Sequence, residues 1–462
     1  MFKFLLSAVA VGAALASAST VAAPSTPSIT WKPQNYSFVD VNIYGRGSYK
    51  QLIQAKDEVN IQIEWNAWSG KGGDSYQVYF DNELVNEGQL SPGSKSGVIS
   101  FPYKKSGRHQ LQIALCDETG CVKSATKPIV IADTDGGHLA PLPLNVNPNN
   151  KQFDTDPNTV VGAYFVEWGI YGRKFDVTQI PADNLTHLLY GFIPICGPNE
   201  SLAEIENGNS LRALNLACGG SEDYEVVIHD PWAAVQKALP GVSSSDPIRG
   251  TYAQLMALKQ RNPDLKILPS VGGWTLSDPF FDFDNKANRD TFVKSMREFL
   301  TTWKFYDGID VDWEFPGGDG ANPNLGSDKD GEVYVTLMKE LRIMLDDLEA
   351  QTGREYELTS AIGSGWDKIE DVDYQQAAQY MDYIFAMTYD FHGGWNNVTG
   401  HQTGIYCGSH LSADECNGTG VDENGEPRKG PAYTLDNAVK LLLEQGVPSE
   451  KLVIGAAMYG RG

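Results

Sequence analysis

The chain has 462 residues, which is enough for two or three domains of about 100 to 200 residues each. Its 59 acidic and 36 basic side chains give a net charge of −23, which makes DNA and other polyanions poor partners but would not repel a neutral polymer. We expect no nucleic-acid partner, and we expect the chain to be monomeric.

Residues 1–23 are typical of a secretory signal peptide. Lys3 precedes an apolar run over residues 4–18, and small residues follow it. Cleavage near Ala22 or Ala23 fits best, and an Ala-x-Ala site at 16–18 is the second choice. The apolar run is too short to span a membrane, and no later segment approaches the length needed. We therefore expect a secreted, extracellular protein that crosses the periplasm in transit and has no membrane partner.

The six cysteines fall into three close pairs: Cys116 and Cys121, Cys196 and Cys218, Cys407 and Cys416. In an exported protein such spacings favour short-loop disulfides, although the sequence leaves their connectivity open. No Cys-x-x-Cys or paired-His spacing accompanies them, so we expect no metal and no cofactor.

Residues 24–135 are predicted to form a small β-sandwich of the fibronectin III or immunoglobulin type. Short alternating runs are separated by Gly, Asn, Asp and Ser clusters, without helical periodicity. These runs are residues 61–65, 76–80, 97–101, 109–116 and 128–132. Residues 136–158, which include Pro141, Pro143, Pro148 and Pro157, predict a linker.

Residues 159–462 follow a different pattern, in which apolar β-branched runs alternate with helix-like segments. The predicted strands are residues 160–167, 185–195, 265–271, 308–315, 356–362, 383–389 and 451–459. The predicted helices are residues 252–261, 289–303, 332–350, 374–380 and 435–445. Strands that are apolar on both faces indicate a parallel sheet. Seven of them favour a (β/α)8 TIM barrel over a nucleotide-binding fold, since no Gly-x-Gly-x-x-Gly follows a strand.

Residues 305–316 read Phe-Tyr-Asp-Gly-Ile-Asp-Val-Asp-Trp-Glu-Phe-Pro and place three acids on one face of the fourth predicted strand. Side chains of an extended chain alternate between faces, so Asp310, Asp312 and Glu314 point one way and Trp313 the other. Crowding three carboxylates raises the pKa of at least one of them. A carboxyl group that stays protonated near neutral pH can act as a general acid.

The acids of residues 310–314 allow two other interpretations. An EF-hand calcium loop that starts at Asp310 would need Gly and Glu where Phe315 and Ala321 stand. A solvated acidic edge strand would not need the large apolar residues between the acids. We therefore favour a catalytic role.

Other predicted strand ends carry residues that suit a carbohydrate. The third strand ends in Ser270-Val271-Gly272-Gly273-Trp274, the sixth in Met387-Thr388-Tyr389-Asp390 and the seventh in Met458-Tyr459-Gly460-Arg461. Leu268 stands where a serine nucleophile elbow would need Gly. Aromatic residues gather at the same predicted rim: Trp168, Tyr171, Trp274, Trp313 and Trp395. We interpret them as a platform for stacking sugar rings.

Together these motifs resemble glycoside hydrolase family 18, of the bacterial chitinase A type. The run from Asp307 to Glu314 fits its D-x-x-D-x-D-x-E motif, and Ser270, Gly272 and Gly273 fit its S-x-G-G motif. The resemblance extends over nearly the whole mature chain. It implies a chitinase that acts on chitin and chito-oligosaccharides and retains the anomeric configuration through substrate assistance.

The resemblance also implies roles for single residues. Glu314 would protonate the glycosidic oxygen. Asp312 would orient the substrate's acetamido N–H and would share its own proton with Asp310. Tyr389 would hydrogen-bond the acetamido carbonyl, and Asp390 would help to bind the distorted sugar. Trp168 and Tyr171 would serve the glycone side, Trp274 and Trp395 the aglycone side, and Phe192, Met387, Tyr459 and Arg461 would line the cleft.

Three further tryptophans match surface positions that guide chitin chains in the family: Trp31, Trp68 and Trp232. A core position is an equally good interpretation of Trp68, because Trp65 lies nearby. At another guiding position the chain has Ser245, so a continuous aromatic track is in doubt.

The sequence stops at Gly462, directly after the seventh predicted strand, and a closed barrel needs an eighth. We interpret the chain as a fragment of a longer product. Two alternative functions stay open: a truncated protein that binds chitin without turnover, and an endo-β-N-acetylglucosaminidase that acts on N-glycans. The intact Glu314 speaks against the first, and the sandwich and aromatic rim speak against the second.

Overall fold

The computed structural model describes residues 22–30, 35–154, 156, 159–205, 208–397, 399–421 and 425–461. The predicted signal peptide, apart from Ala22 and Ala23, and the predicted chitin-guiding Trp31 lie outside these residues. The described residues form two compact units. The first draws on residues 22–30, Glu58–Lys104 and Arg108–Val130, and the second on Asn35–Asp57, Lys105–Gly107 and the described residues from Ile131 onward.

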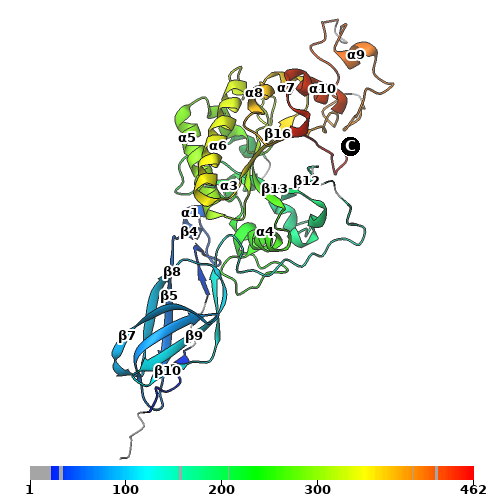
Figure 1. The fold of residues 1–462 in the computed structure, drawn as a ribbon. Coiled ribbons are helices and arrows are strands. Elements are labelled where there is room, and N and C mark those ends of the chain that lie inside the picture. The colour runs from blue at the N-terminus through cyan, green and yellow to red at the C-terminus, as the bar shows by residue number, and fades with distance from the viewer. Residues whose placement is uncertain are drawn as a thin grey trace, which may run out of the picture. The chain divides into compact units, whose positions relative to one another are not determined.

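The first unit is built from antiparallel strands (Figure 1). One sheet has the order β1 (Ser28–Ile29), β5 (Val59–Asn66) and β8 (Ser96–Tyr103). A second has the order β11 (Lys127–Ala132), β9 (Gly107–Asp117), β6 (Gly73–Phe80) and β7 (Glu83–Ser94), with β10 (Gly120–Lys123) beside β9. Along β5 the side chains of Ile61, Ile63 and Trp65 are buried while their neighbours face outward, as the alternating sequence predicts.

All five runs predicted in this region lie within observed strands, but the short strands β1 and β10 and the long strand β7 were not predicted. The long strand β7 is the largest of these misses. Its sequence, Glu-Leu-Val-Asn-Glu-Gly-Gln-Leu-Ser-Pro-Gly-Ser, has no regular apolar alternation, and no position of it is fully buried. Pairing along β6 forms this strand, which local sequence patterns do not reveal.

The second unit contains a seven-stranded parallel sheet in which strands that are consecutive in sequence are neighbours in space. The strands are β12 (Gly162–Val166), β13 (His187–Ile193), β14 (Lys266–Gly272), β15 (Gly308–Asp312), β16 (Glu357–Gly363), β17 (Tyr383–Met387) and β18 (Leu452–Ile454). A doubly wound sheet would reverse this order at a switch point. The uninterrupted order fits part of a TIM barrel.

Helices connect these strands (Figure 1). They include α2 (Glu200–Ala203), α3 (Asn209–Ala217), α4 (Gly250–Arg261), α5 (Lys286–Thr302), α6 (Asp330–Thr352), α7 (Trp366–Glu370), α8 (Tyr374–Ala377), α9 (Ala413–Asn417) and α10 (Leu435–Gln445). Helix α10 has the predicted bounds because Thr434 caps its first turn and Gly446 ends it in a left-handed conformation. The predicted seventh strand is shorter than expected, since regular pairing ends at Ile454.

Shorter elements complete the second unit. They are β2 (Asn35–Ser37), β3 (Val39–Val41), β4 (Ile53–Ala55) and α1 (Tyr49–Leu52), and the turns η1 (Glu167–Ile170), η2 (Val177–Gln179), η3 (Ala182–Asn184), η4 (Trp232–Gln236), η5 (Asp278–Asp282) and η6 (Ser449–Lys451). All three predicted cysteine pairs form disulfides. Within the described ranges, no helix combines the length and the apolar composition that crossing a bilayer requires.

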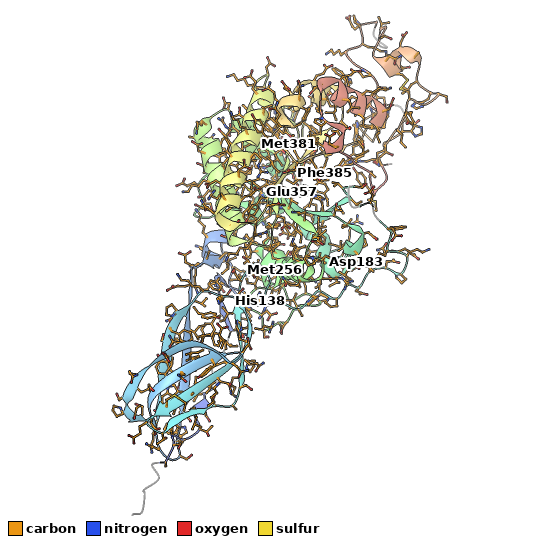
Figure 2. All side chains as sticks on the ribbon, in the orientation of Figure 1. His138, Asp183, Met256, Glu357, Met381 and Phe385 are labelled. Carbon is orange, nitrogen blue, oxygen red and sulfur yellow. A yellow bond between two sulfur atoms is a disulfide. The ribbon has the colours of Figure 1, made fainter. Side chains whose placement is uncertain are left out.

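The core of the second unit lies between the sheet and its helices, where Met256 and Met381 are both buried (Figure 2). The core also contains Trp313, which is 1% exposed and stacks on Phe280 with ring centroids 5.4 Å apart. The prediction that Trp313 contributes to a sugar platform at the rim is therefore wrong. The alternation of strand faces, which places Trp313 opposite the acids, gave the correct answer.

Candidate active site

The three acids lie at the C-terminal end of β15. Every residue of this strand is buried between β14 and β16, so the interpretation as a solvated edge strand is wrong. Asp310 is 0% exposed and Asp312 is 3% exposed, while Glu314 follows the strand and is half-buried.

Asp310 is held by three hydroxyl groups from three different strands. Ser270 on β14 and Thr359 on β16 each donate to it over 2.7 Å, and Tyr164 on β12 donates over 3.0 Å. Burial raises the pKa of Asp310 above its ordinary value, although these three donors oppose the shift.

Asp312 and Glu314 both have strongly raised pKa values. Burial and the neighbouring carboxyl groups of Glu314 and Asp310 raise the pKa of Asp312 well above its usual range. Its Oδ1 is buried and has no hydrogen-bond partner among the described residues. Burial is the main cause that raises the pKa of Glu314 to about 7, and repulsion from the Asp390 carboxylate is the second cause. The site thus contains a carboxyl group that can be protonated near neutral pH, beside a buried oxygen that can accept a hydrogen bond.

The turn after β15 is fixed by the segment that follows β14. The Glu314 backbone N–H donates to the Ser277 hydroxyl over 2.9 Å, and this hydroxyl lies 3.1 Å from the Asp312 carbonyl oxygen, to which it can donate. Gly272 has φ +103°, and a Cβ there would stand 2.3 Å from the same carbonyl oxygen. Gly273 has φ +95°, and a Cβ there would press on the Phe192 ring. Both glycines of the motif therefore allow a close approach that other residues would prevent.

The end of β17 adds a second polar group to the site. Asp390 accepts two hydrogen bonds of 2.7 Å from Arg461 and one of 2.8 Å from Tyr459. Burial would raise the pKa of Asp390, but these hydrogen bonds outweigh it and hold the pKa below its ordinary value. Burial and the Asp312 carboxyl group raise the pKa of Tyr389, so its hydroxyl stays protonated as a donor.

Several of the predicted aromatic residues have aromatic or cationic neighbours, and one row of rings leads away from Tyr164, which binds Asp310. The rings of Tyr164 and Phe192 are 6.4 Å apart, and those of Phe192 and Trp168 are 6.2 Å apart. Trp274 lies edge-on to Phe315 at 6.3 Å, and Trp395 lies 5.2 Å from the Arg461 guanidinium. The side chains of Trp168, Tyr171, Trp274, Trp395 and Tyr459 are exposed, whereas Phe192 and Met387 are half-buried.

Two of the three predicted surface tryptophans lie on described parts of the chain. Trp68 in the first unit is 77% exposed, which rejects the core interpretation, while Trp65 is buried. Trp232 in the second unit is also exposed. Ser245 forms a hydrogen bond with Ser243.

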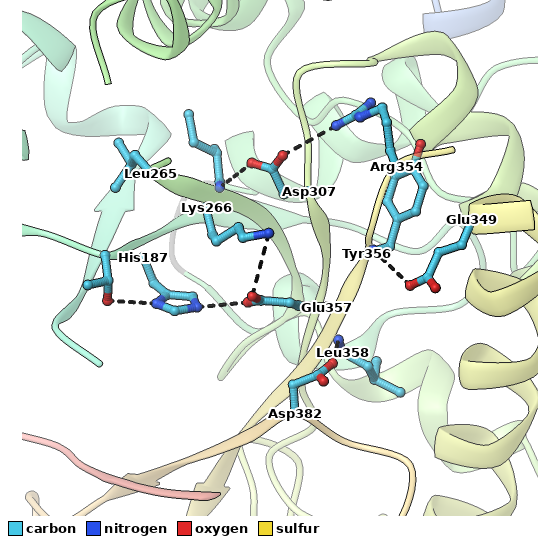
Figure 3. Close-up of polar contacts among 12 residues, drawn as sticks. His187, Leu265, Lys266, Asp307, Glu349, Arg354, Tyr356, Glu357, Leu358 and Asp382 are labelled. Carbon is cyan, nitrogen blue, oxygen red and sulfur yellow. Dashed lines mark hydrogen bonds and ion pairs between the residues drawn. The ribbon is translucent and has the colours of Figure 1, made fainter. Parts of the chain in front are cut away.

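Asp307 lies at the other end of β15 from Glu314. It pairs with Arg354 at 3.3 Å (Figure 3). It also accepts from the Ile267 N–H and pairs with Lys259 at 2.9 Å. These contacts tie the start of β15 to β14 and to the segment before β16. The contacts of Asp307 thus support a structural role for this residue at the start of the strand.

Sequence reasoning missed the roles of Tyr164, Thr359 and Ser277. Ser270 and Thr359 are directly opposite Asp310 in the strand register, so a correct alignment of the three strands would have found them. Ser277 lies in an irregular segment and gave no signal. Within the described residues, no group of three or more His, Cys, Asp or Glu side chains is arranged to hold a metal ion.

Comparisons with known proteins agree with this geometry. A family model described as "Glycosyl hydrolases family 18" matches residues 160–462, and one described as "Chitinase A, N-terminal domain" matches residues 21–157. The chain is 73% identical to the "Chitinase A" of Pseudoalteromonas piscicida over 98% of this chain and 55% of that protein, so it spans about half the relative's length. It is 48% identical to the "Chitinase" of Autographa californica nuclear polyhedrosis virus over 96% of this chain and 77% of that one.

Among solved structures, the chitinase ChiA74 from Bacillus thuringiensis matches with a TM-score of 0.54 and 30% identity. The match covers 64% of this chain and 47% of that one. Taken with the matches along the sequence and the acids at the end of β15, these findings show that the chain belongs to glycosyl hydrolase family 18.

Proposed function

We propose that this chain hydrolyses the β-1,4 linkages of chitin and chito-oligosaccharides with retention of configuration. The observation that carries the proposal is the pairing of Glu314, whose pKa is raised to about 7, with the unpartnered buried Oδ1 of Asp312. The relatives named chitinases support the choice of substrate.

In the proposed reaction, protonated Glu314 gives its proton to the glycosidic oxygen as the bond to C1 breaks. The carbonyl oxygen of the substrate's own 2-acetamido group attacks C1 and forms an oxazolinium ion, so no enzyme nucleophile is needed. Water then attacks C1 as the bond between C1 and the acetamido oxygen breaks, which restores the acetamido group. Glu314 takes the proton of this water as the general base.

Asp312 and Tyr389 would hold the acetamido group during this step. Asp312 Oδ1, which has no partner among the described residues, would accept a hydrogen bond from the acetamido N–H. The negative charge of the Asp312 carboxylate would then stabilise the positive oxazolinium ion. The protonated Tyr389 hydroxyl would donate to the acetamido carbonyl. Asp310, with its three hydroxyl donors, would share the proton that Asp312 gives up.

The exposed aromatic residues would bind the sugar chain by stacking. Trp168 and Tyr171 would serve the glycone side and Trp274 and Trp395 the aglycone side, with Asp390, Tyr459 and Arg461 at the distorted sugar. Trp68 and Trp232 would contact chitin outside the cleft.

The direct test is Glu314→Gln, which keeps the shape of the side chain but removes the proton donor. We expect turnover of chitin oligomers to fall by a factor of about 100 or more. Circular dichroism and thermal melting establish that the variant folds. Near-wild-type hydrolysis would contradict the proposal.

Retention on chitin and cleavage of N-glycans, measured beside turnover of chitin oligomers, separate the two alternatives. A wild-type chain that is retained by chitin but releases no sugar is a binding protein without turnover. A chain that cleaves N-glycans faster than chitin oligomers is an endo-β-N-acetylglucosaminidase.

We also propose the context in which the chain works. Residues 24–135 would form a fibronectin III- or immunoglobulin-like module, joined by the linker 136–158 to the catalytic barrel from residue 159 onward. The protein would be exported and monomeric. Mass spectrometry of the exported product and its sedimentation velocity test these two points.

A further inference from the structure

Glu167 is a buried carboxyl group that the proposed reaction does not use. It begins η1, directly after β12, and is 5% exposed. Its Oε1 accepts from the Tyr190 hydroxyl over 2.8 Å, and its Oε2 accepts from the Asp230 backbone N–H over 3.1 Å. Neither of these partners is a cation, so two hydrogen bonds alone would offset the cost of burying a negative charge on Glu167.

A neutral Glu167 fits this environment. Burial and the nearby Asp230 carboxylate raise its pKa well above the usual range. A protonated carboxyl group offers one donor and one acceptor, as an amide does. Glutamine can therefore replace it at this position, because the Tyr190 hydroxyl can accept as well as donate.

Asp230 connects Glu167 to exposed aromatic side chains. Its Oδ2 accepts from the Tyr171 hydroxyl over 2.5 Å, and its Oδ1 accepts from the Trp232 backbone N–H over 3.1 Å. Trp168 is the residue next to Glu167 in the chain. The network thus bonds the Tyr171 hydroxyl and the Trp232 backbone, and it anchors the residue that precedes Trp168. Trp168, Tyr171 and Trp232 are all exposed, and we call these three residues the aromatic ledge.

Trp168 connects the ledge to the acids of β15 through a row of aromatic rings. From Asp310 the contacts run through Tyr164 and Phe192 to Trp168. A short substrate that reacts at Glu314 needs few of these contacts, whereas a longer chain can extend over the ledge.

We propose that Glu167 and Asp230 are positioning residues that hold the aromatic ledge in place for the distant sugars of a long β-1,4-N-acetylglucosamine chain. This inference rests on the proposed function. According to this inference, Glu167 and Asp230, which lie outside the catalytic strand, help the protein to prefer long substrates over short ones.

The test compares chitohexaose with a chitobiose that carries a fluorogenic leaving group. In Glu167→Ala we expect the ratio of kcat/KM for the hexamer to kcat/KM for the short substrate to fall about tenfold, the effect of losing roughly one well-placed contact. Glu167→Gln should restore most of the wild-type ratio. Asp230→Ala, which breaks the network at its half-buried end, is the second variant in case Glu167→Ala does not fold.

Glu357→Ala is the matched control. Glu357 is a partly buried acid at the start of β16, so it lies at the opposite end of the parallel sheet, where it contacts His187 at 2.7 Å and Lys266 at 3.8 Å (Figure 3). Its removal can lower stability but should leave the substrate ratio unchanged. An unchanged ratio in Glu167→Ala, an equal fall in Glu357→Ala, or a Glu167→Gln variant as poor as Glu167→Ala would overturn the proposal.

Binding of chitohexaose, measured by calorimetry in the Glu314→Gln background, separates this inference from the proposed function. If the wild-type chain binds the hexamer without cleaving it, hydrolysis is refuted, and an affinity about tenfold weaker with Glu167→Ala still upholds the ledge. Equal affinities with and without Glu167→Ala overturn the ledge even if hydrolysis is observed.

Discussion

At the residue scale, the site depends on carboxyl groups with different protonation states. Asp310 receives three hydroxyl donors, and Asp390 is paired with Arg461. Asp312 has a buried oxygen that finds no partner in the described part of the chain. Glu314 lies near Asp390 and is the acid whose pKa is raised to about 7. Similar side chains thus acquire different roles from their surroundings.

The raised pKa of Glu314 predicts a pH-dependent cost in stability. Below the unfolded-state pKa, about 4.3, the carboxyl group is protonated in both states and costs nothing. As the pH rises toward 7, the unfolded chain loses the proton while the folded chain retains it, so stability falls. Glu314→Gln removes this penalty. Relative to the wild type, we expect a melting temperature that is several degrees higher at about pH 8 and nearly equal at about pH 4.

Differential scanning calorimetry of both proteins across this range measures the effect. A difference in melting temperature that is the same at both pH values would show that ionisation of Glu314 is not its cause.

At the element scale, the end of β15 is shaped by its neighbours. The strand register places Ser270 and Thr359 on either side of Asp310. Beyond the strand, the segment after Gly273 supplies Ser277, which bridges the backbone on both sides of Trp313. The position of Glu314 therefore depends on a residue 37 positions earlier in the chain.

Ser277→Ala tests this dependence. The substitution leaves the half-buried Glu314 N–H without its acceptor, so we expect the free energy of unfolding to fall by about 1–3 kcal/mol. We also expect kcat on chitin oligomers to fall about tenfold, less than in Glu314→Gln, because the acid is misplaced but still present. Urea unfolding and steady-state kinetics measure the two effects.

Ser100→Ala is the control for this prediction, since Ser100 is exposed on β8 and its loss should change stability by less than about 0.5 kcal/mol. A wild-type kcat in Ser277→Ala would show that the turn holds Glu314 without this hydroxyl.

At the scale of the whole molecule, the net charge of −23 coexists with exposed tryptophans in both units. Stacking on neutral sugar rings does not depend on that charge. The short-loop disulfides, such as Cys196–Cys218, restrict the unfolded chain and add to the stability of the folded one.

We predict that binding to insoluble chitin is nearly independent of salt. Between about 0.05 M and about 0.5 M sodium chloride, the dissociation constant should change less than about twofold, because screening weakens interactions between charges but not stacking on a neutral polymer. Depletion of the protein from solution by chitin particles measures it. A steep loss of binding with salt would indicate that ion pairs carry the interaction.

The sequence by itself determined the order of the seven parallel strands and the face of β15 that carries the acids, and it favoured the cysteine pairs without fixing their connectivity. These features follow from the alternation of apolar residues and from the spacing of cysteines, and both can be seen in short segments of the sequence. The sequence misplaced Trp313 and missed β7, because burial and strand pairing involve residues distant in the chain.

Only the tertiary structure decided which side chains meet. It brought Tyr164, Ser270 and Thr359 to Asp310 and joined Glu167 to Asp230. It also left Asp312 Oδ1 without a partner among the residues that the structure describes. A pKa depends on burial and on neighbouring charges, and both are fixed by contacts between distant segments. The sequence therefore determined which chemical groups are available, while the fold determined which of them are protonated and which are held in place.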